Sequence, residues 1–94
     1  VIGVGSLTRE NTPAYFSNNA NHCTDIHAPG VEITSTQAIY PAAGEPFNAK
    51  YSGFWKGTSF ATPQVTGVAA LIKSLNSRYN KSNNLTSLFL KTAE

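Results

Sequence analysis

Residues 57–67 read Gly-Thr-Ser-Phe-Ala-Thr-Pro-Gln-Val-Thr-Gly and open the most strongly patterned part of the 94-residue chain. From the third position onward, apolar side chains recur at steps of three and four residues, the spacing of one helix face. The members of this stripe are Ala61, Val65, Val68, Ala69, Ile72 and Leu75. The pattern predicts a helix ending near Asn76, with Val65, Ile72 and Leu75 against a sheet. Its small residues, which predict close packing on that sheet, are Gly67, Ala69 and Ala70.

The start of this helix places a hydroxyl group where it can serve either structure or chemistry. Thr58 or Ser59 is a suitable N-cap, and Pro63 falls in the first turn, where its missing N–H costs little. The Ser59 hydroxyl would also lie near unpaired backbone N–H groups and the positive end of the helix dipole, which stabilise a developing negative charge. A serine nucleophile needs that environment. The residues alone leave capping and nucleophilic attack both open.

Short strands are indicated before the helix. Val1–Ser6 is an apolar run interrupted by glycine, as in a strand buried on both faces of a parallel sheet. Asp25–Ala28 predicts a second strand that ends at Pro29-Gly30, and Val31–Ser35 alternates like a half-exposed strand. The expected fold class is therefore α/β with a parallel sheet.

The remaining segments predict a closing helix and two loops. Leu85–Thr92 has the period of a short helix, with Asn83 or Asn84 as its cap. Arg9–Asn21 is a polar loop whose Tyr15-Phe16 pair is expected to plug onto the core. Gln37–Lys56 is a long connection, and such loops are usually functional or mobile.

Composition excludes several classes of protein. A chain of 94 residues suffices for one small domain but not for two. The net charge of +2 comes from scattered basic residues, which argues against a nucleic-acid partner, and no apolar run reaches the length of a bilayer span. The opening at Val1 lacks the pattern of a signal peptide and resembles an interior start.

Cysteine and carboxylate usage predict neither an intrachain disulfide nor a metal site in this chain. The single Cys23 is either a buried or idle thiol or forms a bridge to another chain or to a segment outside these residues. Calcium needs several converging oxygens, whereas the acidic residues are isolated from one another. These acidic residues are Glu10, Asp25, Glu32, Glu45 and Glu94.

Residues 57–67 resemble the serine-bearing signature of the subtilisin-like serine proteases, and further segments resemble that family in the same order. These segments are Val1–Gly5, Tyr15-Phe16-Ser17, Asp25–Val31, Val68–Ile72 and Leu85–Thr92. The resemblance covers nearly the whole chain. It implies that residues 1–94 are the C-terminal portion only of a parallel-sheet, subtilisin-like peptidase domain, with short strands, a nucleophile-bearing helix and a closing helix.

The resemblance implies that Ser59 is the nucleophile and that its own N–H is one oxyanion donor. It places Thr58 beside that donor, and Gly57 leaves room for a bound backbone. Trp55 and Lys56, at the end of the long connection, are candidates to contact substrate side chains beyond the scissile bond; the alternative is that the aromatic residues form a mini-core that closes the loop.

The subtilisin triad runs in the order Asp, His, Ser, with an Asn side chain as the second oxyanion donor. By that order the Asp, His and Asn lie before Val1, so the isolated chain is expected to be inactive. His22 and His27 with Asp25 are interpreted as structural residues rather than replacements.

Two departures from the family pattern, Gln64 where His is common and Phe60 where Met is frequent, are interpreted as packing variation.

The resemblance also implies partners and surroundings. Expected partners are a peptide or protein substrate and the rest of the catalytic domain, in cis or as another chain. No cofactor is expected in this chain, although structural calcium is expected to be compatible with the complete protein. A secreted or cell-surface location follows for the family. The alternative function is a non-catalytic, peptide-binding or regulatory relic of the same fold.

Overall fold

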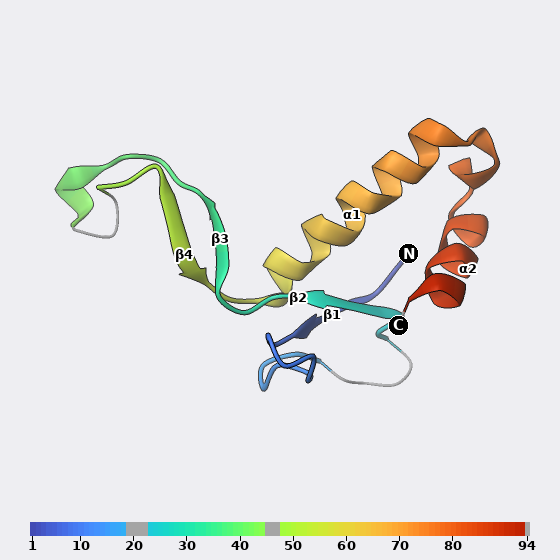
Figure 1. The fold of residues 1–94 in the computed structure, drawn as a ribbon, viewed down its shortest axis with the longest axis horizontal. Helices are drawn as coiled ribbons and strands as arrows, with labels where there is room; N and C mark the ends of the chain where they lie inside the picture. Colours follow the sequence, from blue (N-terminus) through green and yellow to red (C-terminus); the bar gives the residue numbers. More distant parts are fainter. Residues whose placement is uncertain (19–22, 45–47, 94) are drawn as a thin grey trace.

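The computed structural model describes residues 1–18, 23–44 and 48–93. Strands and helices follow one another as β1 (Val4–Leu7), β2 (Ile26–Pro29), β3 (Ile33–Thr36), η1 (Pro41–Ala43), β4 (Tyr51–Trp55), α1 (Thr58–Leu75), η3 (Ser77–Asn80) and α2 (Ser82–Thr92). The extents of the chain are 47 × 30 × 20 Å, and the long dimension includes the β3–β4 hairpin, which extends away from the helices (Figure 1). The fold is a small α/β arrangement with a parallel strand pair.

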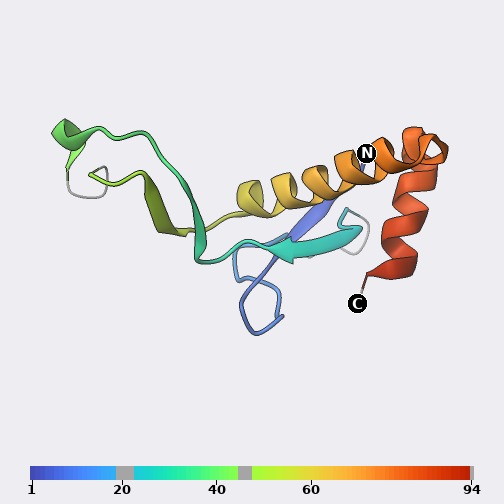
Figure 2. The same ribbon diagram turned by 45° about the horizontal axis from the view of Figure 1, so that its top comes forward.

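The parallel pair consists of β1 and β2, in register from Val4 opposite Ile26 to Leu7 opposite Pro29. Helix α1 lies over one face of this pair, and α2 follows beyond the far end of α1 (Figure 2). The sequence predicted both strands and their parallel class, with boundaries displaced by one to three residues. Strand ends are the least determined part of a sequence-based assignment because the flanking residues have similar propensities.

The hydrophobic core lies between the strand pair and the two helices. Its buried members are Ala28, Ala61, Val65, Leu85 and Phe89. Ala61 is fully buried, and the small side chains of Ala28 and Ala61 let α1 approach β2 closely. Ile72 is partly buried against this core, as the apolar stripe predicted.

The carboxyl half of α1 does not match the prediction. Leu75 is 85% exposed, although the stripe placed it on the sheet. An added Cβ at Gly67 would meet nothing within 4 Å, and Ala70 is exposed, so neither of these residues sets the packing distance. The reason is length: 18 helical residues extend about 27 Å, whereas four strand residues extend only about 13 Å. The described strands therefore support only part of α1.

Residues 37–56 were expected to form an irregular connection, but they contain a strand. β4 pairs antiparallel with β3, with Thr36 opposite Tyr51 and Ile33 opposite Trp55. The register shifts between Ile33 and Ser35, which indicates a bulge. The sequence Tyr-Ser-Gly-Phe-Trp in β4 has aromatic residues that favour strands. Its polar and apolar residues do not alternate clearly, so the sequence pattern did not predict this strand.

The loop before β2 is anchored differently from the prediction. Tyr15 is 86% exposed, so it does not plug onto the core, and Phe16 is only partly buried. The buried residues of this loop are Ala14 and Ser17. The amide of Ala14 donates to the Ser6 carbonyl at 2.9 Å, and the Ser6 amide donates to Ser17 Oγ at 2.8 Å. Small residues that bond to β1 hold the loop, and the aromatic pair remains outside.

Helix α2 confirms the predicted closing helix, but its cap differs. Lys81 occupies the N-cap position, and no side chain caps the helix. Asn84 instead donates from Nδ2 to the Arg78 carbonyl at 2.8 Å, which ties the helix to the preceding turn.

Candidate active site

The turn before α1 depends on Gly57. This residue has φ 143° and ψ 155°, a region that is essentially reserved for glycine. Its amide donates to the Gly30 carbonyl at 2.8 Å, and the Gly30 amide donates to the Leu7 carbonyl at 3.1 Å. These bonds fix the start of α1 to the ends of β1 and β2.

The amino end of α1 is open. Gly57 is the N-cap, so the expectation that Thr58 or Ser59 caps the helix is wrong. No side chain caps the helix, and its first turn contains no acidic residue. The Phe60 amide donates to the Gly57 carbonyl at 3.0 Å, whereas the Thr58 and Ser59 amides make no backbone hydrogen bond among the described residues. The positive end of the dipole therefore remains available to a negatively charged group.

Ser59 lies in the first turn of this open end and is exposed. Its hydroxyl makes no hydrogen bond within the described residues. A Cβ added at Gly57 would lie 3.1 Å from Ser59 Oγ, so the absence of a side chain at this glycine leaves room beside the hydroxyl. A capping hydroxyl would be occupied by a backbone amide. The Ser59 hydroxyl is therefore free for an approaching group.

Gln64 connects the first turns of α1 to the parallel strands. Its Nε2 donates to the Pro29 carbonyl at 2.7 Å and to the Phe60 carbonyl at 2.9 Å. Phe60 stacks on Trp55 with ring centroids 6.0 Å apart and planes at 24°. Gln64 and Phe60 thus hold the helix start against β2 and β4.

Lys56 lies between β4 and the Gly57 turn. Its Nζ donates to the Tyr15 hydroxyl at 3.1 Å and lies 5.4 Å from the centroid of the Tyr15 ring. Trp55 is 37% exposed, so its ring is only partly covered by Phe60. Both Trp55 and Lys56 adjoin the turn that carries Ser59, as the sequence placed them.

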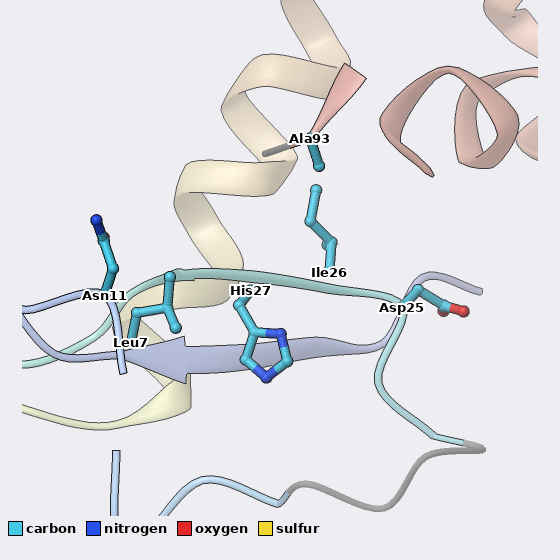
Figure 3. Close-up of a pocket in the computed structure, with 6 residues that line it drawn as sticks. All are labelled: Leu7, Asn11, Asp25, Ile26, His27 and Ala93. Carbon is cyan, nitrogen blue, oxygen red and sulfur yellow. The ribbon is translucent and has the colours of Figure 1, made fainter. Parts of the chain in front are cut away.

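His27 lies on the sheet face opposite α1. Ala28 packs against α1, and adjacent residues of a strand point to opposite faces. Figure 3 shows the His27 ring on the opposite side of β2 from Ile26, which points toward Ala93. In the part of the chain that the structure describes, His27 forms no side-chain hydrogen bond with Ser59 or Asp25. His22 lies outside the described residues.

Asp25 is already occupied by the backbone. Its Oδ2 accepts a hydrogen bond from the Gly3 amide at 2.8 Å. Asp25 and His27 line a cavity of about 560 Å³ together with Leu7, Asn11, Ile26 and Ala93 (Figure 3). In Figure 3 the Asp25 carboxylate and the His27 ring point in different directions. They do not form a carboxylate and histidine pair directed at Ser59.

The described residues contain neither a metal-binding cluster nor a membrane-spanning helix. Within residues 1–18, 23–44 and 48–93, no group of three or more His, Cys, Asp or Glu side chains could hold a metal ion. No helix in these ranges is both long and apolar enough to cross a bilayer. Cys23 is exposed with a free thiol, so it is not buried, and the expectation of an idle thiol stays a prediction.

The sequence did not predict the positions of Ser6 and Tyr15, two residues that shape the site. Ser6 is fully buried and lies next to Gly30, because a Cβ at Gly30 would overlap Ser6 Oγ. Tyr15 meets Lys56 from a distant loop. The Pro29-Gly30 pair signalled a turn at Gly30, but no local pattern predicts the neighbours of Ser6 or Tyr15.

The site is thus an exposed serine at the amino end of a helix that has no side-chain cap and packs on a pair of parallel strands. The chain matches the Subtilase family over residues 1–94 and belongs to that family. The resemblance found in the sequence is therefore confirmed.

Individual relatives agree with this assignment. The chain is 41% identical over 75 residues to an intracellular serine protease of Paenibacillus polymyxa, covering 80% of this chain and 20% of the relative. It is 39% identical over 84 residues to alkaline serine exoprotease A of Vibrio alginolyticus, covering 86% and 13%. It is 38% identical over 90 residues to subtilisin-like protease 12 of Arthroderma benhamiae, covering 77% and 19%. The chain spans a fifth or less of the length of these relatives.

Proposed function

We propose that this chain carries the nucleophile of a serine endopeptidase, and that Ser59 attacks the carbonyl of the scissile peptide bond. The observation that carries the proposal is the free, exposed Ser59 hydroxyl at an uncapped helix start. Two of the relatives are named as serine proteases, and this supports peptide-bond hydrolysis as the reaction class. Attack would create an oxyanion, which backbone N–H groups at this helix end would stabilise.

Each neighbouring residue has a separate role in the proposal. The Ser59 amide donates to the oxyanion, and Thr58 forms the adjacent wall. Gly57 admits the substrate backbone beside the hydroxyl, because any side chain there would crowd Ser59 Oγ. Trp55 and Lys56 contact substrate side chains beyond the scissile bond.

The proposed reaction needs a base that takes the serine proton. His27 does not supply it, because its side chain lies on the opposite face of the sheet from α1. We assign the base, its Asp partner and the oxyanion Asn to polypeptide outside these 94 residues, preceding them in the family order. The chain alone would then be inactive.

The proposal extends to the surroundings of the complete protein. A secreted or cell-surface location remains part of it, although the relatives are named both an exoprotease and an intracellular protease. Structural calcium would belong to the complete protein.

A chimera tests the proposed nucleophile. The part of the Paenibacillus catalytic domain that precedes the aligned region is fused before Val1, and hydrolysis of an activated peptide ester is measured. Ser59→Ala is the test variant, and Ser74→Ala is the matched control because Ser74 lies near the opposite end of α1. We expect Ser59→Ala to lose about a millionfold in turnover, the size of the effect in subtilisin itself, and Ser74→Ala to retain activity.

Two results would contradict the proposal. Turnover that persists in the Ser59→Ala chimera would show that another group attacks the substrate. A chimera that folds and binds peptide but never hydrolyses it would favour the non-catalytic relic.

A further inference from the structure

Lys56 carries an ammonium group that is held by an aromatic residue. It precedes Ser59 by three residues, and its Nζ donates to the Tyr15 hydroxyl at 3.1 Å. The ammonium also lies 5.4 Å from the centroid of the Tyr15 ring, within the range of a cation–π interaction. An ammonium has three donors, so two remain for other acceptors after the bond to Tyr15. The side chain is exposed and can meet a ligand.

The carboxylates of the described residues do not compensate the charge of Lys56. Within residues 1–18, 23–44 and 48–93, no carboxylate pairs with the Lys56 ammonium. Glu32, at the base of the hairpin, instead pairs with Arg9 at 3.0 Å. The described residues from Ile33 to Lys56 include the cations Lys50 and Lys56 but no acidic residue. Among the described residues of the hairpin, the charge next to the helix start is therefore positive, and Glu45 lies outside these residues.

We propose that Lys56, positioned by Tyr15, recognises an acidic side chain of the substrate beyond the scissile bond. This inference rests on the proposed function, because it assigns a substrate class to the same site. A glutamate or aspartate of the peptide would accept from the two remaining Lys56 donors. Its alkyl part would contact the exposed portion of the Trp55 ring. The preferred substrates are then acidic peptides.

A binding experiment separates this inference from hydrolysis. The 94-residue chain, carrying Ser59→Ala so that no peptide is cut, is labelled with ¹⁵N and titrated with blocked alanine hexapeptides. One peptide has two central glutamates, and the other has two glutamines at the same positions. Trp55 is the only tryptophan, so its indole N–H gives a single assigned signal next to Lys56.

The matched control is Lys50→Gln. It makes the same change of charge and type as Lys56→Gln on the same hairpin. Lys50 lies six residues earlier, which is about 20 Å along an extended chain, and it is also exposed. Both variants are checked by circular dichroism before titration.

We expect the glutamate peptide to bind about threefold to fivefold more tightly than the glutamine peptide, because exposed ion pairs contribute modestly. This preference should shrink in high salt, vanish in Lys56→Gln and survive in Lys50→Gln. Equal binding of the two peptides, a preference that persists in Lys56→Gln, or no shift of the Trp55 signal with either peptide would each overturn the inference. Failure of the proposed function would be detected in a different experiment, the chimera, where hydrolysis would be absent or would not depend on Ser59.

Discussion

Replacing Gly57 by alanine should damage both the stability of the chain and the placement of Ser59. Gly57 has φ 143°, and residues other than glycine pay about 1–3 kcal/mol in this region. The added Cβ would lie 3.1 Å from Ser59 Oγ and 3.7 Å from Phe60 Cδ2. The first distance is tight, so the hydroxyl must shift by a few tenths of an ångström. We therefore expect lower stability together with a displaced nucleophile.

Urea unfolding, followed by far-ultraviolet circular dichroism, measures the first effect. With a slope of about 1.5 kcal/mol per molar, the Gly57→Ala midpoint should fall by about 0.7–2 M. Gly67→Ala is the control, because Gly67 lies inside α1 with nothing within 4 Å of an added Cβ. It should raise stability by about 0.5–1 kcal/mol, the usual preference for alanine in a helix. Equal midpoints for Gly57→Ala and the parent, or equal losses in both variants, would refute the argument.

Three further predictions concern the chain by itself. The isolated chain should hydrolyse an activated peptide ester no faster than its Ser59→Ala variant, and serine-dependent turnover at ordinary protease rates would contradict this. The chain should self-associate through exposed apolar residues of α1, because the side chains of Leu71 and Leu75 are 65% and 85% exposed. The double variant Leu71→Ser, Leu75→Ser should therefore show a lower mass by light scattering, and a compact monomer of the parent chain at high concentration would contradict this prediction. Ser6→Ala should leave the urea midpoint unchanged or raise stability by about 1 kcal/mol, because the buried Ser6 Oγ has no hydrogen-bond partner among the described residues; a clear decrease would show that this hydroxyl is paired.

The helical period predicted α1 well because its signal is local and repeated. Its bounds, Thr58–Leu75, lie within two residues of the expected ones. The spacing of apolar residues in the helix could not show how long the underlying strands are. It therefore placed Leu75 against the sheet, although β1 and β2 do not extend that far. Burial depends on the partner's length, which the helix sequence does not contain.

The hairpin and the Lys56 contact were harder to predict for a different reason. β4 has no alternating pattern, and a bulge separates its register into two parts. The Tyr15 and Lys56 side chains are 41 residues apart in the sequence, so their contact follows only from the folded path of the chain. The sequence nevertheless identified Lys56 and Trp55 as neighbours of the site, because both adjoin Ser59 along the backbone.

The position of Ser59 depends on a series of backbone hydrogen bonds that involve no catalytic side chain. The Gly30 amide donates to Leu7, the Gly57 amide donates to Gly30, and the Phe60 amide donates to Gly57 at 3.0 Å. These bonds connect β1 to the first turn of α1. A side chain at Gly30 would overlap Ser6 Oγ, so this position requires glycine for space. Gly57 requires glycine for its φ of 143°, and an added Cβ there would also crowd the Ser59 hydroxyl. The β3–β4 hairpin lies between the two glycines in sequence but outside this series of bonds. Trp55 at the end of the hairpin stacks on Phe60, so the hairpin contacts the helix start through side chains and not through these backbone bonds.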